Sequence, residues 1–280
     1  MICFPGTDLF SLNLMQPTLH TAVNAARKAG NIVSRNLARV DSLSRHAKQR
    51  NDFVTEIDLQ AEREIIGMIR RVYPDHRILA EESGSDTVRD EASEYQWIID
   101  PLDGTTNYLH GFPHYSVSIA LRYRNTLETG VIYDPFRGEL FCASRGHGAT
   151  LNDRKIRVAR LPTLEGSLLG TGFPFRENQD TGTYLATLEA FMLRTSGIRR
   201  AGSAALDLAY VAAGRLDGFW EFGLNIWDIA AGCLIIQEAG GLVGDTAGGH
   251  THLDSGDIVA ANAKLFRQML NTIHQAVKDR

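Results

Sequence analysis

The chain has 280 residues, of which 44% are hydrophobic, and a formal net charge of −4 with a pI near 6.1. This length suits one large domain or two small ones that share an interface. The negative net charge provides no positive electrostatic potential that would let the chain bind nucleic acid unaided. Its three widely spaced cysteines argue against a disulfide framework or a cysteine-based zinc site and fit a reducing compartment such as the cytoplasm. No apolar run approaches the roughly 18 residues that indicate a membrane span.

The first part of the chain predicts two helices after a loose extension. Residues 1–14 lack the charged start and long apolar core of a secretory signal. An apolar stripe predicts a helix from Thr18 to about Leu37, and the polar segment from Asp41 to Asp52 is expected to be a loop or an irregular hairpin. Thr55 and Asp58 have the spacing of a capping box before a second helix. A helix-cap role is the ordinary one for Asp58, and a place near a catalytic site stays open.

Two acidic turns then follow short strands. A strand predicted over Arg77–Ala80 leads into two adjacent carboxylates, Glu81 and Glu82. The apolar run Trp97–Ile99 predicts a buried strand that ends at Asp100. Solvated surface charge is the usual role of a single acidic pair, and it is the second acidic turn nearby that favours a functional site here.

The second turn has the composition of a metal site. Asp100 and Asp103 flank Pro101, which cannot continue a sheet ladder. Two carboxylates about 4 Å apart repel by roughly 4 kcal/mol at an effective dielectric of about 20, so a buried cluster must protonate, pair with a base or bind a metal. No Lys or Arg lies between residues 97 and 112, and hard oxygen ligands favour Mg²⁺, Mn²⁺ or Ca²⁺. A helix beginning after Gly104 would add an anion site; the alternative is that both acids only form the turn.

The remainder of the chain predicts strands first and then an alternation of strands and helices. Apolar runs at Tyr115–Arg122, Leu127–Asp134 and Glu139–Ala143 are separated by turns and predict an antiparallel meander. From about Arg157 the alternation favours a layered α/β half after an α+β half. The elements expected there are strands at 167–172, 216–221 and 258–261 and helices at 183–194, 203–213, 226–239 and 263–277.

Three polar residues of this second half stand where an element begins or ends. Ser203 and Asp228 each begin a predicted helix, where a cap or a dipole partner is the ordinary role. Glu221 ends a strand beside apolar neighbours, and a lone acid in such a place needs a partner or a ligand.

Together these segments form a specific set of motifs, which closely resembles the inositol monophosphatase family and its bacterial SuhB-type members from Met15 to the C-terminus. The resemblance implies a layered αβαβα sandwich of the inositol monophosphatase and fructose-1,6-bisphosphatase type, and a homodimer. It implies an N-terminal half, 15–156, with most metal ligands, and a C-terminal half, 157–280, with the substrate contacts and Asp228. The motifs are Glu81-Glu82-Ser83-Gly84, Trp97 to Asn107 (W-I-I-D-P-L-D-G-T-T-N), Gly202-Ser203-Ala204-Ala205-Leu206-Asp207 and Ile226-Trp227-Asp228-Ile229-Ala230-Ala231-Gly232.

The resemblance also implies a role for each site residue. Glu81, Asp100 and the Leu102 carbonyl would hold one Mg²⁺, and Asp100, Asp103 and Asp228 a second, with a further, weaker ion near Glu81. Metal-activated water, positioned by Thr105 and Glu81, would attack the phosphate directly, without a phospho-enzyme. The implied catalytic residues are Glu81, Asp103 and Thr105, and the implied substrate contacts are Asp103, Gly104, Thr105, Gly202, Ser203, Ala204, Glu221 and Asp228.

Two functions of different classes follow from the resemblance. The first is a Mg²⁺-dependent, lithium-sensitive inositol-1-monophosphatase that releases myo-inositol and phosphate. The second is a SuhB-type transcription antitermination partner of NusA and RNA polymerase, with catalysis secondary. Within the enzyme class, sugar bisphosphates and 3′-phosphoadenosine nucleotides are alternative substrates, which the match from Gly202 to Asp228 makes less favoured.

Overall fold

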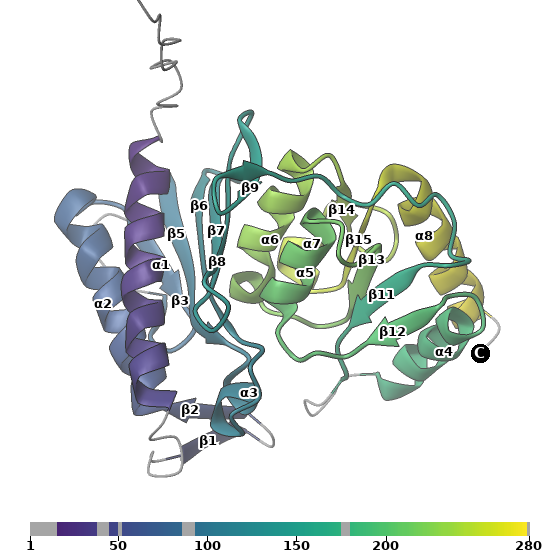
Figure 1. The fold of residues 1–280 in the computed structure, drawn as a ribbon, viewed down its shortest axis with the longest axis horizontal. Helices are drawn as coiled ribbons and strands as arrows, with labels where there is room; N and C mark the ends of the chain where they lie inside the picture. The colour runs from purple at the N-terminus through teal and green to yellow at the C-terminus, as the bar shows by residue number, and fades with distance from the viewer. Residues whose placement is uncertain (1–15, 38–44, 50–51, 86–92, 175–179, 279–280) are drawn as a thin grey trace, which may run out of the picture.

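The computed structural model describes residues 16–37, 45–49, 52–85, 93–174 and 180–278, so the expected extension at 1–14 lies outside the described residues. Helices and sheets alternate in five layers (Figure 1). An outer helix pair, α1 and α2, covers an eight-stranded sheet; α5 and α6 form an inner pair; a five-stranded sheet and the pair α4 and α8 complete the stack. The predicted αβαβα sandwich is confirmed.

The helices and strands have the following bounds. The helices are α1 Pro17–Asn36, α2 Glu56–Val72, α3 Thr105–Leu109, α4 Thr181–Met192, α5 Ala204–Ala212, α6 Ile226–Glu238, α7 His252–Ser255 and α8 Ala263–Lys278. The strands are β1 Arg45–Gln49, β2 Asp52–Thr55, β3 Arg77–Ala80, β4 Gly84–Ser85, β5 Tyr95–Asp103, β6 Ser116–Tyr123, β7 Thr126–Asp134, β8 Glu139–Ser144, β9 Gly148–Leu151, β10 Arg154–Lys155, β11 Leu168–Thr171, β12 Gly197–Arg199, β13 Gly218–Glu221, β14 Leu242–Gly244 and β15 Ile258–Ala261.

The first sheet has the strand order β10-β9-β8-β7-β6-β5-β3-β4. Its pairs are antiparallel except that of β3 with β5, so the predicted meander is confirmed. Both faces of this sheet are covered: on β6, Val117 and Ile119 pack on the side of α1 and α2, and Ala120 packs on the side of α6. Burial on both faces explains why these strands read as nearly continuous apolar runs. β1 and β2 form a separate hairpin with an irregular register, which agrees with the expected irregular hairpin.

Strand β5 runs beyond its expected end. Asp100 pairs with Ser118, and after an irregularity in the register Asp103 pairs with Ser116, so pairing resumes past Pro101. The prediction that the strand ends at Asp100 was therefore wrong. The proline lies in the bulged stretch, where its missing N–H removes no ladder hydrogen bond. The bulge keeps both carboxylates on one rim of the sheet.

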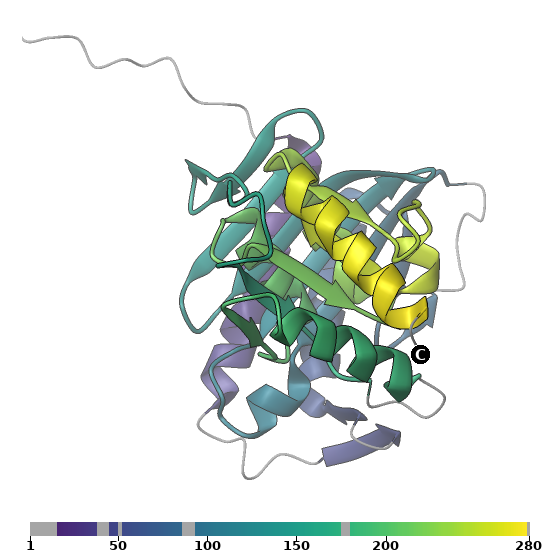
Figure 2. The same cartoon turned by 90° about the vertical axis from the view of Figure 1, so that its right-hand side faces the viewer.

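The second sheet has the order β12-β11-β13-β15-β14. β11 is parallel to β12 and β13, and β15 is antiparallel to β13 and β14. Figure 2 shows α4 and α8 crossing in front of it, and Phe191 of α4 and Met269 of α8 pack there against Trp220 in one buried cluster. This is the predicted layered α/β half. No helix within the described ranges is long and apolar enough to cross a membrane.

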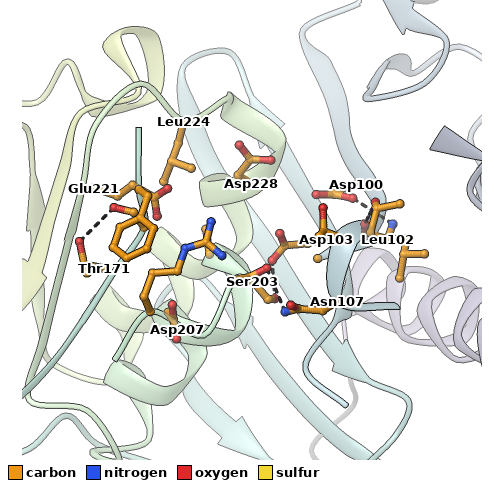
Figure 3. A pocket seen from close by; sticks show the side chains of 18 of the residues that line it. Asp100, Leu102, Asp103, Asn107, Thr171, Ser203, Asp207, Glu221, Leu224 and Asp228 are labelled. Atoms are coloured by element: carbon orange, nitrogen blue, oxygen red, sulfur yellow. Dashed lines mark hydrogen bonds between the residues drawn. The ribbon is translucent and has the colours of Figure 1, made fainter. Parts of the chain in front are cut away.

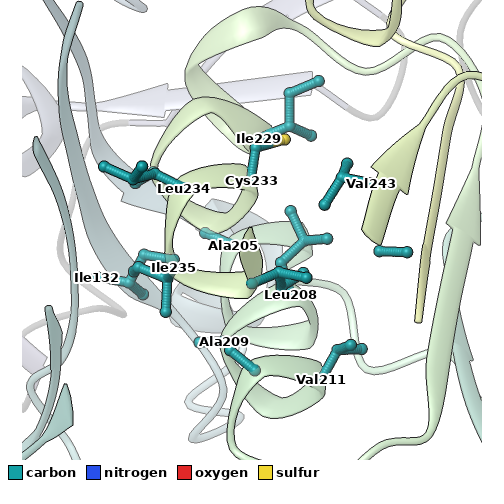
Figure 4. Close-up of a cluster of buried hydrophobic side chains, with 14 of the residues drawn as sticks. Ile132, Ala205, Leu208, Ala209, Val211, Ile229, Cys233, Leu234, Ile235 and Val243 are labelled. Atoms are coloured by element: carbon teal, nitrogen blue, oxygen red, sulfur yellow. The ribbon is translucent and has the colours of Figure 1, made fainter. Parts of the chain in front are cut away.

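The inner helices α5 and α6 pack against both sheets. Their side chains lie between the strand that carries Ile132 and the strand that carries Val243, within one buried cluster (Figure 4). Small residues permit very close approach, since a Cβ added at Gly130 of β7 would lie 2.8 Å from the Ala231 carbonyl oxygen. A Cβ at Gly232 of α6 would lie 2.6 Å from a Leu208 carbon. The two halves of the chain therefore share one core.

Candidate active site

A cavity of about 350 Å³ lies where β5 ends and where α3, α5 and α6 begin. Figure 3 shows Asp100 and Asp103 on one side of it, Glu221 and Thr171 on the other, and Asp228 between them. The structure brings all the residues expected from the sequence together here: Glu81, Asp100, Leu102, Asp103, Gly104, Thr105, Gly202, Ser203, Ala204, Glu221 and Asp228. It adds Thr106, Asn107, Thr171, Gly172, Phe173, Arg200, Asp207, Gly223 and Leu224.

Asp100 is the most enclosed of the clustered acids. Its side chain is 1% exposed and accepts a 2.9 Å hydrogen bond from the Leu102 backbone N–H. Burial raises the pKa of Asp100 well above its usual value, and the charges of Glu81, Asp103 and Asp228 raise it further. These carboxylates are thus close enough to repel one another, and a cation between them would stabilise their ionised forms.

Asp103 joins the two halves of the chain. Its Oδ2 accepts hydrogen bonds from the Ser203 hydroxyl at 2.5 Å and from the Ala205 backbone N–H at 2.8 Å. Burial raises the pKa of Asp103 to about 6, although these hydrogen bonds oppose that shift. Ser203 is also the N-cap of α5 and accepts from the Leu206 N–H. Ser203 therefore caps α5 and lines the cavity at the same time.

Asp228 likewise serves both its helix and the cavity. It lies in the first turn of α6, and its Oδ2 accepts a 2.7 Å hydrogen bond from the Asn225 backbone N–H. This is the helix-start role that the sequence favours for an acid at this position. The same residue lines the cavity with Asp100 and Asp103.

Thr105 is held by an acid of helix α2. Its hydroxyl lies 3.2 Å from Oδ1 of Asp58 and 3.0 Å from the Leu102 carbonyl oxygen. Asp58 is 1% exposed, in the first turn of α2. Asp58 therefore lies beside the candidate site, and the capping role expected with Thr55 falls on a side chain outside the described residues.

Glu62 supports the turn that follows Glu81, and sequence reasoning missed it. Its two carboxylate oxygens accept the backbone N–H groups of Glu82 at 2.8 Å and Ser83 at 3.0 Å. Glu62 lies four residues after Asp58 on α2, so the two acids share one helix face. This spacing of two acids on the buried side of a helix is the sequence pattern that could have identified both Asp58 and Glu62.

The turn after Asp103 depends on a glycine and an amide. Gly104 has φ +91°, and a Cβ there would lie 3.0 Å from the His114 carbonyl oxygen. The Asn107 amide nitrogen lies 2.7 Å from that same oxygen and 2.8 Å from the Ala201 carbonyl oxygen, which links the two walls of the cavity. α3 has only five residues, so its dipole is small and the expected anion site depends on the N–H groups of the turn itself.

The opposite wall contains two more acids. Glu221 ends β13 and lies against Gly172, where any Cβ would collide with its carboxylate. Asp207, part of a motif but given no role from the sequence, is 2% exposed. Burial raises the pKa of Asp207 well above its usual value; the charges of Glu221 and Asp103 add to this, and that of Arg200 opposes it.

The donor atoms of the cavity suit a hard divalent cation. Glu81, Asp100, Asp103 and Asp228 offer only oxygen atoms, which Mg²⁺ prefers to the Cys and His ligands of zinc. Within the described ranges, no group of three or more acidic, Cys or His side chains is already arranged around one point. The chemistry of the donor set fits the metal, whereas the side-chain positions are not those of a preformed cage.

Comparisons with known proteins place the chain in a family. The model of the inositol monophosphatase family matches residues 14–278. The chain belongs to the inositol monophosphatase family. One relative, the Nus factor SuhB of Pseudomonas aeruginosa, is 53% identical over 261 residues, which cover 92% of this chain and 96% of that protein. The Nus factor SuhB of Escherichia coli K12 is 48% identical over 265 residues, covering 95% of this chain and 98% of that protein.

Solved structures of family members agree. The extragenic suppressor protein suhB of Bartonella henselae has 44% sequence identity and a TM-score of 0.88, covering 91% of this chain and 98% of its own. An inositol monophosphatase from Anabaena has 39% sequence identity and a TM-score of 0.83, and the match covers 94% of this chain and 97% of that protein. Family and fold together support a phosphatase activity in general terms.

Proposed function

We propose that this family member is a Mg²⁺-dependent phosphomonoesterase that hydrolyses myo-inositol 1-phosphate to myo-inositol and phosphate. One observation carries the proposal: Glu81, Asp100, Asp103 and Asp228, from three separate segments of the chain, line a single cavity. Burial and the charges of neighbouring carboxylates raise the pKa values of Asp100 and Asp103. Such a cluster favours binding of a cation together with a phosphate.

The metal ligands proposed are the oxygen donors of this cluster. Glu81, Asp100 and the Leu102 carbonyl would hold one Mg²⁺, and Asp100, Asp103 and Asp228 a second, with a third, weaker ion near Glu81. When bound, Mg²⁺ would neutralise the phosphate charge and make water easier to ionise. In this proposal residues 15–156 supply most of the ligands, and residues 157–280 supply Asp228 and most substrate contacts.

The side chains of the first wall would position the water and the phosphate. With its hydroxyl proton donated to Asp58, the Thr105 oxygen can accept a hydrogen bond from the attacking water. Glu81 would take one proton of that water as the water oxygen bonds to phosphorus and the bond from phosphorus to the alcohol oxygen breaks, and the departing alcohol oxygen would take up a proton from solvent. The N–H groups of Gly104 and Thr105 would bind phosphate oxygens as charge develops on them.

The second wall would recognise the alcohol. Its Ser203 hydroxyl and Glu221 carboxylate, together with the Asp103 carboxylate of the first wall, suit the hydroxyl groups of a polyol. Gly202, Ala204 and Asp228 complete this contact surface.

The deciding experiment is phosphate release from myo-inositol 1-phosphate by the purified chain, with and without Mg²⁺ and with added Li⁺. We expect turnover that requires Mg²⁺ and is inhibited by Li⁺. The matched control is Asp100→Asn, assayed at equal concentration. A folded wild-type protein that binds Mg²⁺ but releases no phosphate would contradict the proposed substrate.

A transcription role is the second candidate function. It is favoured by the relatives at 53% and 48% identity that are named Nus factor SuhB. In this role we propose a cytoplasmic homodimer that joins NusA and RNA polymerase through protein contacts, since a net charge of −4 gives little affinity for RNA alone. The test is a pull-down with NusA and RNA polymerase, using wild type and Asp100→Asn. Capture by both variants would separate this role from catalysis, and capture by neither would count against it.

A further inference from the structure

Two buried titratable side chains face each other beside the cavity, and the proposed reaction uses neither. Asp207, in the first turn of α5, is 2% exposed and lines the cavity on the side away from Asp100 (Figure 3). His114 lies between α3 and β6 and is 6% exposed. The Nε2 atom of His114 lies 3.9 Å from Oδ1 of Asp207. The pair therefore connects the two halves of the chain at the edge of the site.

Within the described ranges, each of these two groups has only the other as a polar neighbour. Nε2 of His114 is buried and forms no hydrogen bond there. The carboxyl group of Asp207 accepts no hydrogen bond and forms no salt bridge with a Lys or Arg of this part of the chain. Buried polar atoms are hydrogen-bonded in the great majority of cases. An approach of about 1 Å would bring the two atoms to hydrogen-bond distance.

The surroundings of Asp207 favour its uncharged form. Burial raises the pKa of Asp207 well above its usual value, and the charges of Glu221 and Asp103 raise it further. The charge of Arg200 opposes this shift. Burial is the largest of these causes, and it does not depend on whether Mg²⁺ neutralises Asp103. Asp207 therefore has a proton to donate, since a protonated carboxyl group has one O–H donor.

The surroundings of His114 favour a neutral ring. Burial and the charge of Arg137 lower the pKa of His114 to about 4, and the charge of Asp134 opposes this shift. The ring also packs edge-to-face against Tyr210 of α5, with the centroids 5.8 Å apart. A neutral imidazole has one nitrogen that accepts a hydrogen bond. An O–H donor on Asp207 thus faces an acceptor nitrogen on His114.

The pair also connects two backbone segments that the proposed substrate would contact. The carbonyl oxygen of His114 accepts the Asn107 amide at 2.7 Å, and a Cβ at Gly104 would lie 3.0 Å from it. The backbone N–H of Asp207 donates to the Ser203 carbonyl oxygen at 3.0 Å. A hydrogen bond between the two side chains would therefore fix the turn of Gly104 relative to the start of α5.

Two other roles of Asp207 predict different behaviour. A carboxylate that bound a metal ion or a substrate hydroxyl would need its charge, so Asn in its place would be as harmful as Leu. A side chain that only filled space would be replaced by Leu at little cost. The buried carboxyl group without a Lys or Arg partner in the described ranges, next to an unpaired imidazole nitrogen, favours an uncharged donor.

We propose that Asp207 is a positioning residue that acts as an uncharged acid and donates its carboxyl proton in a hydrogen bond to Nε2 of His114. This bond sets the distance between the N–H groups after Asp103 and the alcohol contacts at the start of α5. It also keeps one further negative charge away from the substrate phosphate. The inference rests on the proposed phosphatase function and adds a positioning residue to that same site.

The first test is steady-state kinetics with myo-inositol 1-phosphate at saturating Mg²⁺. Asp207→Asn keeps a donor that cannot ionise, so it should keep kcat/KM within about 3-fold of wild type. Asp207→Leu and His114→Phe each leave the other group unpaired, so each should lower kcat/KM about 10-fold or more. The variant with both Leu and Phe should lie within about 3-fold of either single variant. Losses that multiply in the double variant, or an Asn variant as impaired as the Leu variant, would overturn the inference.

The second test observes the proton itself and needs no turnover. Nitrogen NMR of protein labelled with ¹⁵N-histidine, at neutral pH with Mg²⁺, should show a neutral His114 that is protonated at Nδ1 and accepts a hydrogen bond at Nε2. His114→Phe assigns the signal, and Asp207→Leu should remove the hydrogen-bond shift at Nε2. An imidazolium, or a neutral ring protonated at Nε2, would refute the pair. If wild type releases no phosphate, the proposed function fails, and this signal alone decides whether the pair exists.

Discussion

The two walls of the cavity are built by different means. Asp100 and Asp103 belong to β5, whose backbone pairs with β6 on both sides of a bulge. Ser203 and Asp228 belong instead to the first turns of α5 and α6 or their caps, and both are held by backbone N–H groups. The sheet wall thus carries two of the proposed metal ligands, with Asp228 facing them as a ligand from the helix-start wall, and the helix-start wall carries most of the proposed alcohol contacts. If this division holds, changes on the sheet wall should lower kcat and changes on the helix-start wall should raise KM.

The largest effect is expected on the sheet wall. Asp100→Asn should lower kcat by about 1,000-fold or more, because it removes a charged ligand shared by two proposed metal sites. Stability should not fall, since the substitution removes a buried, repelled charge. Steady-state kinetics and thermal unfolding of the same preparation measure both quantities. Full activity in this variant would refute the metal-ligand assignment.

Thr105 should give the next largest effect on the same wall. Thr105→Val should lower kcat by roughly 100-fold with KM nearly unchanged, because a positioned proton-transfer group contributes about 10²- to 10⁴-fold. Thr105→Ser keeps the hydroxyl near Asp58 and should recover most of the rate. If Val and Ser variants behave alike, the hydroxyl has no part in the reaction.

The helix-start wall should respond differently. Ser203→Ala removes the hydroxyl that donates to Asp103 and caps α5. We expect KM for myo-inositol 1-phosphate to rise by about 10-fold, with kcat changed less than about 3-fold, since one hydrogen bond to a charged group contributes about 1.5–3 kcal/mol. Loss of the cap should cost about 1 kcal/mol of stability. A fall in kcat as large as that of Thr105→Val would contradict the division between the walls.

The smallest effect concerns stability without metal. The pKa of Asp103 is raised to about 6 in the metal-free fold. The protonated Asp103 side chain therefore stabilises the fold fully below pH 3.8, its ordinary pKa, and this contribution to the free energy of unfolding is lost as the pH rises through about 6. Mg²⁺ would replace the lost proton. Added Mg²⁺ should therefore raise Tm by a few degrees more at pH 8 than at pH 5. In Asp103→Asn, thermal unfolding at both pH values should show a smaller difference.

The sequence predicted the long elements well and the short ones poorly. α1, α2 and α8 each bury one face, and this periodicity is visible in the chain itself. α5 and α6 were expected as helices, but their place between two sheets came from the family resemblance, because an all-apolar helix has no directional pattern. β12, β14 and α7 have three or four residues each, which is too short for a periodic signal.

The site shows a similar limit. The family motifs identified the acids that line the cavity, and their convergence in one place is a structural finding. Glu62 and Arg200 received no role, because an acid in the second turn of a helix and an arginine two residues before a glycine are ordinary surface residues in a linear sequence. Only the fold shows that Glu62 holds the turn after Glu81 and that Arg200 lies over Gly202.

The glycines of the inner layer have a consequence for how the chain tolerates change. One added methyl group would push the Ala231 backbone of α6 away from the sheet at Gly130, and would push α5 and α6 apart at Gly232. β5 and α6 carry opposite sides of the carboxylate cluster, so either change would shift α6 and with it Asp228. The spacing of the acids thus depends on two glycines, Gly130 and Gly232, which have no side chain. Random mutagenesis should find loss-of-function variants at such positions in proteins that remain folded.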